Sequence, residues 1–131
     1  MRDRLVLLAE DYDDTRALYA DHLRAAGFRV VEAADGEEAV ALAISQKPDA
    51  IVMDLSMPRV DGWDATRRIR ADAELAHTYI VALSALDGEI SRSMAFDAGC
   101  NDFIAKPFLP AALVAVLTVH FRADDDGTLG D

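Results

Sequence analysis

Short apolar runs alternate with longer amphipathic segments along nearly the whole chain, and this alternation constrains the fold more than any other feature. The predicted strands are 4–10, 28–34, 49–55, 78–85 and 102–106, and the predicted helices are 11–27, 35–47, 64–75, 87–99 and 110–121. The runs are almost continuously apolar, which is typical of strands covered on both faces. Strict alternation of this kind predicts an α/β fold, with a five-stranded parallel sheet, helices on both faces and right-handed crossovers.

Residues at the ends of the predicted helices support these boundaries. Gly27 and Gly99 each follow a helical segment, where glycine commonly ends a helix. Glu37 and Glu38 lie in the first turn of the second helix, where the helix dipole favours acids. Pro110 lies in the first turn of the fifth helix, which is a position that tolerates proline.

The length and composition indicate one globular domain. The chain has 131 residues, 52% of them hydrophobic and 28% charged. We expect the domain to span 1–123 and residues 124–131 to form a flexible acidic tail. The whole segment "RADDDGTLGD" is predicted to be frayed. No further domain follows the tail, which favours a complete chain.

The charge of the chain narrows the classes of partner. The formal net charge is -11, which disfavours non-specific binding to nucleic acid or to anionic membranes. It fits a partner with a basic surface or a bound cation, and it is also explained by solubility alone. A single cysteine, Cys100, excludes an internal disulfide and fits a reducing compartment. No segment reaches the length of a signal core or of a membrane span, so we expect a cytoplasmic protein without membrane insertion.

Polar side chains gather where the predicted strands end. Glu10 and Asp11 follow the first strand, Asp54 ends the third, Ser84 ends the fourth and Lys106 ends the fifth. In an open parallel sheet, ligands bind beyond these carboxyl ends, so the five side chains are expected to meet. Three neighbouring carboxylates repel one another, and a divalent cation removes that conflict. Oxygen ligands of this type suit Mg²⁺.

A carboxylate beside a metal can also act as a nucleophile. If Asp54 accepts a phosphoryl group, then Mg²⁺, the Lys106 ammonium and the Ser84 hydroxyl are the groups that would stabilise the transferred oxygens. Taken singly, each feature has a simpler explanation. The pair Glu10–Asp11 could cap a helix, Ser84 could do the same, and a lysine before proline could be a solvated turn.

Four motifs carry a resemblance to a known family. The stretches "AEDYDDTR", "VMDLSMPRVDG", "ALSA" and "AKPF" occur in this order. Together they resemble the receiver domain of two-component response regulators, the CheY-like family, over residues 4–121. The resemblance implies a doubly wound (βα)5 sheet of flavodoxin type with strand order 2-1-3-4-5.

The resemblance also implies a role for each site residue. Asp54 is implied to be the phospho-acceptor. Glu10 and Asp11 are implied to bind Mg²⁺ together with Asp54, with Asp11 as the more direct ligand. Ser56 is implied to lend its backbone carbonyl to the metal.

Further positions match residues that stabilise the phosphoryl group and transmit its presence. Ser84 is implied to hydrogen-bond the phosphoryl oxygen, and Lys106 to pair with phosphorylated Asp54. Pro107 matches a cis-proline site, where an X-Pro bond makes the cis form accessible. Phe103 matches an aromatic switch position that moves inward when Ser84 is drawn to the phosphate.

Two positions depart from the commonest family pattern. The switch position is often tyrosine, whereas Phe103 has no hydroxyl and could instead be a plain core residue. Leu86 lies two residues after Ser84 and, with Ser56, occupies a position that tunes access of water to the phosphoryl group. An apolar Leu86 does not orient water, which predicts a long-lived phosphorylated form.

These features favour a single-domain signalling protein over an enzyme. The expected donor is a sensor histidine kinase or a phosphotransfer protein, and the expected output is a protein contact through the fourth helix, fifth strand and fifth helix, without direct DNA binding. One alternative is a small Mg²⁺-dependent phosphatase, although Ser56 stands where such an enzyme has a second aspartate. Another is a receiver-shaped scaffold that takes no phosphate. A homodimer through a face containing Leu113, Val116, Leu117 and His120 is also open.

Overall fold

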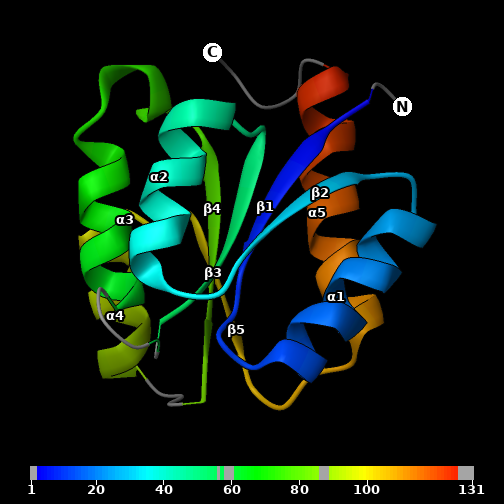
Figure 1. Ribbon diagram of the computed structural model, residues 1–131, viewed down its shortest axis with the longest axis horizontal. Helices are drawn as coiled ribbons and strands as arrows, with labels where there is room; N and C mark the ends of the chain where they lie inside the picture. Colours follow the sequence, from blue (N-terminus) through cyan, green and yellow to red (C-terminus); the bar gives the residue numbers. More distant parts are fainter. Residues whose placement is uncertain (1–2, 56, 58–60, 86–88, 127–131) are drawn as a thin grey trace.

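The computed structural model describes residues 3–55, 57, 61–85 and 89–126, with the backbone alone at 89–91. Its elements alternate as predicted (Figure 1). The strands are β1 (Leu5–Ala9), β2 (Arg29–Ala33), β3 (Ala50–Asp54), β4 (Tyr79–Ser84) and β5 (Asp102–Ala105). The helices are α1 (Asp13–Ala25), α2 (Gly36–Gln46), α3 (Gly62–Arg70), the 3₁₀ turn η1 (Ala73–Leu75), α4 (Glu89–Ala98) and α5 (Pro110–Asp125).

The five strands form one parallel sheet in the order β2-β1-β3-β4-β5, which confirms the predicted topology. Helices cover both faces: α1 and α5 lie on one side of the sheet, and α2, α3 and α4 lie on the other (Figure 1). The strand order reverses between β1 and β3, so the chain switches direction across the sheet there. Ligands bind at such switch points, beyond the carboxyl ends of the strands.

Two apolar layers explain why the strands are continuously apolar. Along β1, Leu7 points into the layer that contains α2, α3 and α4, whereas Val6 and Leu8 point into the layer that contains α1 and α5. All three side chains are fully buried. Full burial of an aliphatic side chain stabilises a fold by about 1.5–3 kcal/mol, so both faces of the sheet contribute.

The helix ends follow local signals in the sequence. Gly27 and Gly99 have positive φ values of 100° and 119°, which confirms their expected place after a helix. The Asp35 side chain accepts a hydrogen bond of 2.8 Å from the Glu38 backbone N–H and so caps α2. Asp61 caps α3 in the same way, through a 2.9 Å bond from the Asp64 backbone N–H.

The third helix differs from its predicted bounds of 64–75. It begins earlier, at Gly62, because the Asp61 side chain caps it. It ends at Arg70, and a separate 3₁₀ turn follows, capped by Asp72 through the Glu74 backbone N–H. Asp72, as the cap of this turn, therefore divides one expected helix into two elements.

The fifth helix continues to Asp125 instead of ending at residue 121, so residues 122–125 of the segment expected to be frayed are helical in the structure. Arg4, a buried residue before β1, explains the extra turn. Its guanidinium forms ion pairs with Asp125 and, at 3.3 Å, with Asp124, and it lies 4.7 Å above the Phe121 ring. Residues 127–131 lie outside the described part of the chain.

Two of the four α5 residues suggested for a homodimer are turned toward the sheet, whereas Val116 and His120 are half-buried. Leu113 and Leu117 are 1% and 0% exposed and belong to the layer shared with α1. Of the suggested face, only Val116 and His120 would be accessible to a second copy, and the homodimer stays a prediction. Within the described residues, no helix combines the length and the apolar character that crossing a membrane requires.

Candidate functional site

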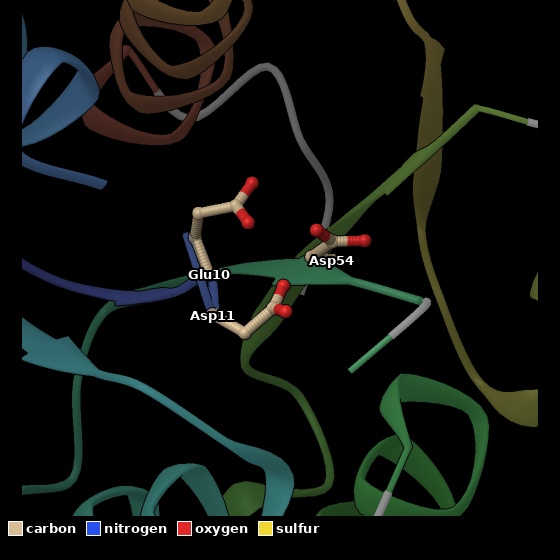
Figure 2. Close-up of side chains that lie close together, drawn as sticks. All are labelled: Glu10, Asp11 and Asp54. Atoms are coloured by element: carbon tan, nitrogen blue, oxygen red, sulfur yellow. The ribbon is translucent and has the colours of Figure 1, made fainter. Parts of the chain in front are cut away.

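The site lies at the carboxyl ends of four neighbouring strands. Asp54 is the last residue of β3 and Ser84 the last residue of β4, while Glu10 follows β1 and Lys106 follows β5. Parallel pairing brings these ends to one edge of the sheet. Figure 2 shows the side chains of Glu10 and Asp11 clustered with that of Asp54. The prediction that these side chains meet is confirmed for the three acids and Lys106, whereas the meeting of the Ser84 side chain with them stays a prediction.

Lys106 pairs with the buried carboxylates of the site. Its ammonium lies 2.9 Å from Asp54 Oδ2 and 3.3 Å from Glu10 Oε1, so one cation bridges two acids. Asp54 and Glu10 are each only 2% exposed. Charges removed from water are expensive unless they are paired, and this bridge supplies a partner charge for both carboxylates.

The backbone fixes Lys106 at the end of β5. Its N–H donates a 2.7 Å hydrogen bond to the Ser84 carbonyl, which extends the β4–β5 ladder by one residue. The Lys106–Pro107 peptide bond is cis, as the resemblance implies. Ser84 itself is buried, with 1% of its surface exposed. Lys106 thus reaches Asp54 from the end of β5, and Ser84 lies at the end of β4, the strand between them.

Burial and charge shift the ionisation of two site residues. Burial raises the pKa of Glu10 to about 7, helped by the Asp54 charge and opposed by a hydrogen bond from the Tyr12 backbone N–H and by Lys106. Burial alone would lower the pKa of Lys106, but the hydrogen bond and charge of Asp54, followed by those of Glu10, outweigh it and the net pKa is raised. Lys106 is therefore a permanent cation at neutral pH.

Glu10, Asp11 and Asp54 could together hold a metal ion. Each offers one carboxylate oxygen, and these three oxygens lie within 4.8 Å of one another. Glu10 and Asp54 are buried whereas Asp11 is exposed, so the cluster opens to solvent on one side. Mg²⁺ prefers oxygen ligands and keeps several of its waters, and a cluster with a solvent-facing side fits that preference.

The comparisons with known proteins decide the family. The family model described as the response regulator receiver domain matches residues 6–118. The chain belongs to the response regulator receiver family. The receiver fold is likewise shared with solved structures: chemotaxis protein CheY4 of Vibrio cholerae has a TM-score of 0.85 at 28% identity, over 90% of this chain and 98% of that one.

Two further relatives are more similar in sequence. The receiver domain of sensor histidine kinase PA1611 from Pseudomonas aeruginosa is 40% identical, with a TM-score of 0.80, over 90% of this chain and 97% of that one; its structure has a magnesium ion coordinated in the active site cleft. Transcriptional regulatory protein PrrA of Mycobacterium tuberculosis is 38% identical over 118 residues, which is 89% of this receiver and 49% of PrrA. This receiver spans about half the length of the curated relatives it matches.

The close approach of Gly62 to the site was not identified from the sequence, where this residue is only the last position of the motif "VMDLSMPRVDG", before the predicted helix 64–75. A Cβ atom at Gly62 would lie 2.2 Å from the Asp54 backbone oxygen and 2.5 Å from Leu55 Cα. The Gly62 N–H donates a 3.2 Å hydrogen bond to the Leu55 carbonyl, and Thr66 Oγ1 donates one of 2.7 Å to the Gly62 carbonyl. Gly62 therefore allows the start of α3 to pack directly on the backbone of the predicted acceptor.

The remaining predicted residues divide into two groups. Phe103 is buried on β5 within the layer that contains α2, α3 and α4, which agrees with its reading as a core residue and leaves its switching role a prediction. Ser56, predicted to supply a carbonyl to the metal, and Leu86, predicted to tune phosphate lifetime, lie outside the described residues.

Proposed function

We propose that this receiver accepts a phosphoryl group on Asp54, in the presence of Mg²⁺, from a sensor histidine kinase or a histidine phosphotransfer protein. One observation carries the proposal. At the end of β3, the carboxylate of Asp54 is buried, paired with Lys106 at 2.9 Å and clustered with the two acids that follow β1. A nucleophile, a cation and a candidate metal cluster thus occupy one place.

The reaction forms one bond and breaks another. An oxygen of the Asp54 carboxylate donates an electron pair to phosphorus, and the bond between phosphorus and the donor nitrogen breaks. The electron pair of that bond stays with the donor imidazole. When water later attacks the phosphoryl group, Asp54 is restored as a carboxylate and inorganic phosphate leaves.

Negative charge gathers on the phosphoryl oxygens during transfer, and the residues around Asp54 can stabilise it. The Lys106 ammonium already lies within hydrogen-bond distance of the carboxylate, so it needs only a small shift to contact an oxygen of the transferred group. Ser84, at the end of the adjacent strand, would donate its hydroxyl. Mg²⁺, held by Glu10, Asp11, Asp54 and the Ser56 carbonyl, would neutralise charge on the same oxygens.

Receiver domains act as phospho-acceptors in signalling rather than as conventional enzymes, so the output is a change in binding. We infer that the output of this protein is a contact with a partner protein through α4, β5 and α5. Met94 and Phe96 on α4 are 46% and 43% exposed, and Val119 on α5 is 67% exposed, which leaves large apolar side chains available on this face.

Ser84 and Phe103 would link Asp54 to that face, because they lie on the adjacent strands β4 and β5. The net charge of -11 favours a basic partner and opposes direct DNA binding. It also opposes self-association at low salt, so a homodimer would require the exposed apolar residues of α4 and α5. A single buried free thiol, Cys100, fits a cytoplasmic setting for this receiver.

Intact mass spectrometry after incubation with acetyl phosphate and Mg²⁺ tests the proposal. We expect the wild type to gain one phosphoryl group, and we expect no gain with EDTA or in Asp54→Asn. Asp21→Asn, which changes an exposed aspartate on α1, should gain the group normally. A phosphoryl group that persists in Asp54→Asn would show that another residue is the acceptor.

A further inference from the structure

Arg92, on α4, places its guanidinium over the ring of Phe103 on β5. The guanidinium carbon lies 5.2 Å from the ring centroid, within the range in which a cation is attracted to an aromatic face. Phe103 is only 6% exposed, whereas Arg92 is exposed. The ring therefore lies between the apolar layer beneath α4 and a charged group at the surface.

This contact joins α4 to the two strands that end in the phosphorylation site. Phe103 pairs with Ala82 of β4, and two residues further along the same ladder Ser84 pairs with Ala105. Lys106 follows directly on β5. A displacement of the Phe103 ring would thus disturb the segment of backbone from which both Ser84 and Lys106 extend.

We propose that Arg92 is a positioning residue that holds Phe103 in its buried position before any phosphoryl group is present. The inference rests on the proposed function, in which Phe103 links Asp54 to the output face. With Arg92 in place, the buried position of the ring is already favoured before phosphorylation, and phosphorylation of Asp54 adds only a smaller shift toward it. Without Arg92, the position of the ring depends on whether Asp54 is phosphorylated.

The size of the effect follows from the exposure of the arginine. A cation–π contact at an exposed site corresponds to a change of about two- to five-fold in the ratio of buried to exposed ring. Arg92→Ala removes the contact and should raise the exposed population of the ring by that factor. Arg92→Lys keeps the charge but loses the planar guanidinium, so it should fall between Arg92→Ala and the wild type.

The accessibility of the Phe103 ring measures this population directly. The protein is labelled with ¹³C-phenylalanine, the Phe103 signals are assigned by comparison with Phe103→Leu, and their relaxation by a soluble paramagnetic probe is recorded. We expect Arg92→Ala to increase the relaxation by about two- to five-fold in the unphosphorylated protein. Acetyl phosphate with Mg²⁺ should return it to the wild-type value. Arg67→Ala, which removes an exposed arginine from α3, is the control and should change nothing.

A second signal reports the contact itself. The Arg92 side-chain N–H should be shifted upfield by the ring in the wild type, and Phe103→Leu should abolish the shift. Equal ring accessibility in Arg92→Ala and Arg67→Ala, or an Arg92 signal that is indifferent to Phe103→Leu, would overturn the inference. Intact mass measured on the same samples shows separately whether Asp54 is phosphorylated. The ring measurement without a phosphoryl donor does not require phosphorylation, so it tests the role of Arg92 independently of the proposed function.

Discussion

Replacing Gly62 by alanine tests how closely α3 must approach the site. The new Cβ atom would lie 2.2 Å from the Asp54 backbone oxygen, 2.5 Å from Leu55 Cα and 2.9 Å from the Asp54 carbonyl carbon. All three neighbours are backbone atoms at the end of a central strand, so no side chain can rotate away. Relief requires the start of α3 to move by about 1 Å, since normal Cβ contacts lie beyond roughly 3.0–3.4 Å.

The expected cost follows from this geometry. Forcing an extra carbon into a packed site costs about 1–3 kcal/mol, and a rigid backbone neighbour places this substitution toward the upper end. Alanine is also the better helix former, by about 1 kcal/mol over glycine, so propensity alone predicts the opposite sign. We expect the clash to win. For a domain of this length the loss corresponds to a fall in Tm of about 4–12 °C.

Thermal and urea unfolding of Gly62→Ala measure the change in stability. Ala115→Gly, at an exposed position inside α5, calibrates the effect of propensity in the same protein. We also expect the rate of phosphorylation by acetyl phosphate to fall, because the displaced helix moves the Asp54 backbone. A variant as stable as the wild type, or more stable, would refute the reasoning about close approach.

Three further predictions concern charged side chains. Lys106→Met should lower Tm in EDTA, because it leaves two buried carboxylates without their cation. Mg²⁺ should reduce this loss of Tm. An equal loss with and without Mg²⁺ would contradict the prediction. Without metal, the folded protein holds the Glu10 proton up to about pH 7, whereas the unfolded chain releases it near 4.5, so the contribution of Glu10 to stability should decrease as the pH rises from 4.5 to 7. In Glu10→Gln, the curve of Tm against pH should therefore flatten over this range. An unchanged slope would exclude Glu10 as the cause. Arg4→Met should speed amide hydrogen exchange in residues 122–125. Tm should fall by only a few degrees, because the partner carboxylates reach solvent. Unchanged exchange would show that Arg4 does not hold the last turn of α5.

The sequence predicted the sheet well because its strands are covered on both faces. Residues such as Leu7 and Val6 point to opposite layers yet are both apolar, so a run like "LVLLA" has no strand–helix ambiguity once helices flank it. Helix ends were also predictable where the signal is local, as at Gly27 and Gly99. The site followed from the sheet, because a parallel order brings the strand ends to one edge.

The features that were not predicted depend on contacts between distant parts of the chain. The last turn of α5 is held by Arg4, which lies 120 positions away from Asp124 in the sequence. Gly62 was read as a loop residue because its close approach to Asp54 exists only after α3 packs on β3. The bridge from Lys106 to Glu10, as well as to Asp54, likewise depends on how far each side chain extends at the edge of the sheet.

Identification of the phosphorylated residue tests the central claim most directly. The protein is treated with acetyl phosphate and Mg²⁺, the acyl phosphate is reduced with borohydride, and the peptides are sequenced by mass spectrometry. Reduction converts a phosphorylated aspartate to homoserine, which marks the acceptor permanently. We predict homoserine at position 54, and its loss when Mg²⁺ is removed. Homoserine at another aspartate, or a peptide spanning 50–54 that stays unmodified while the protein gains phosphate, would contradict the account.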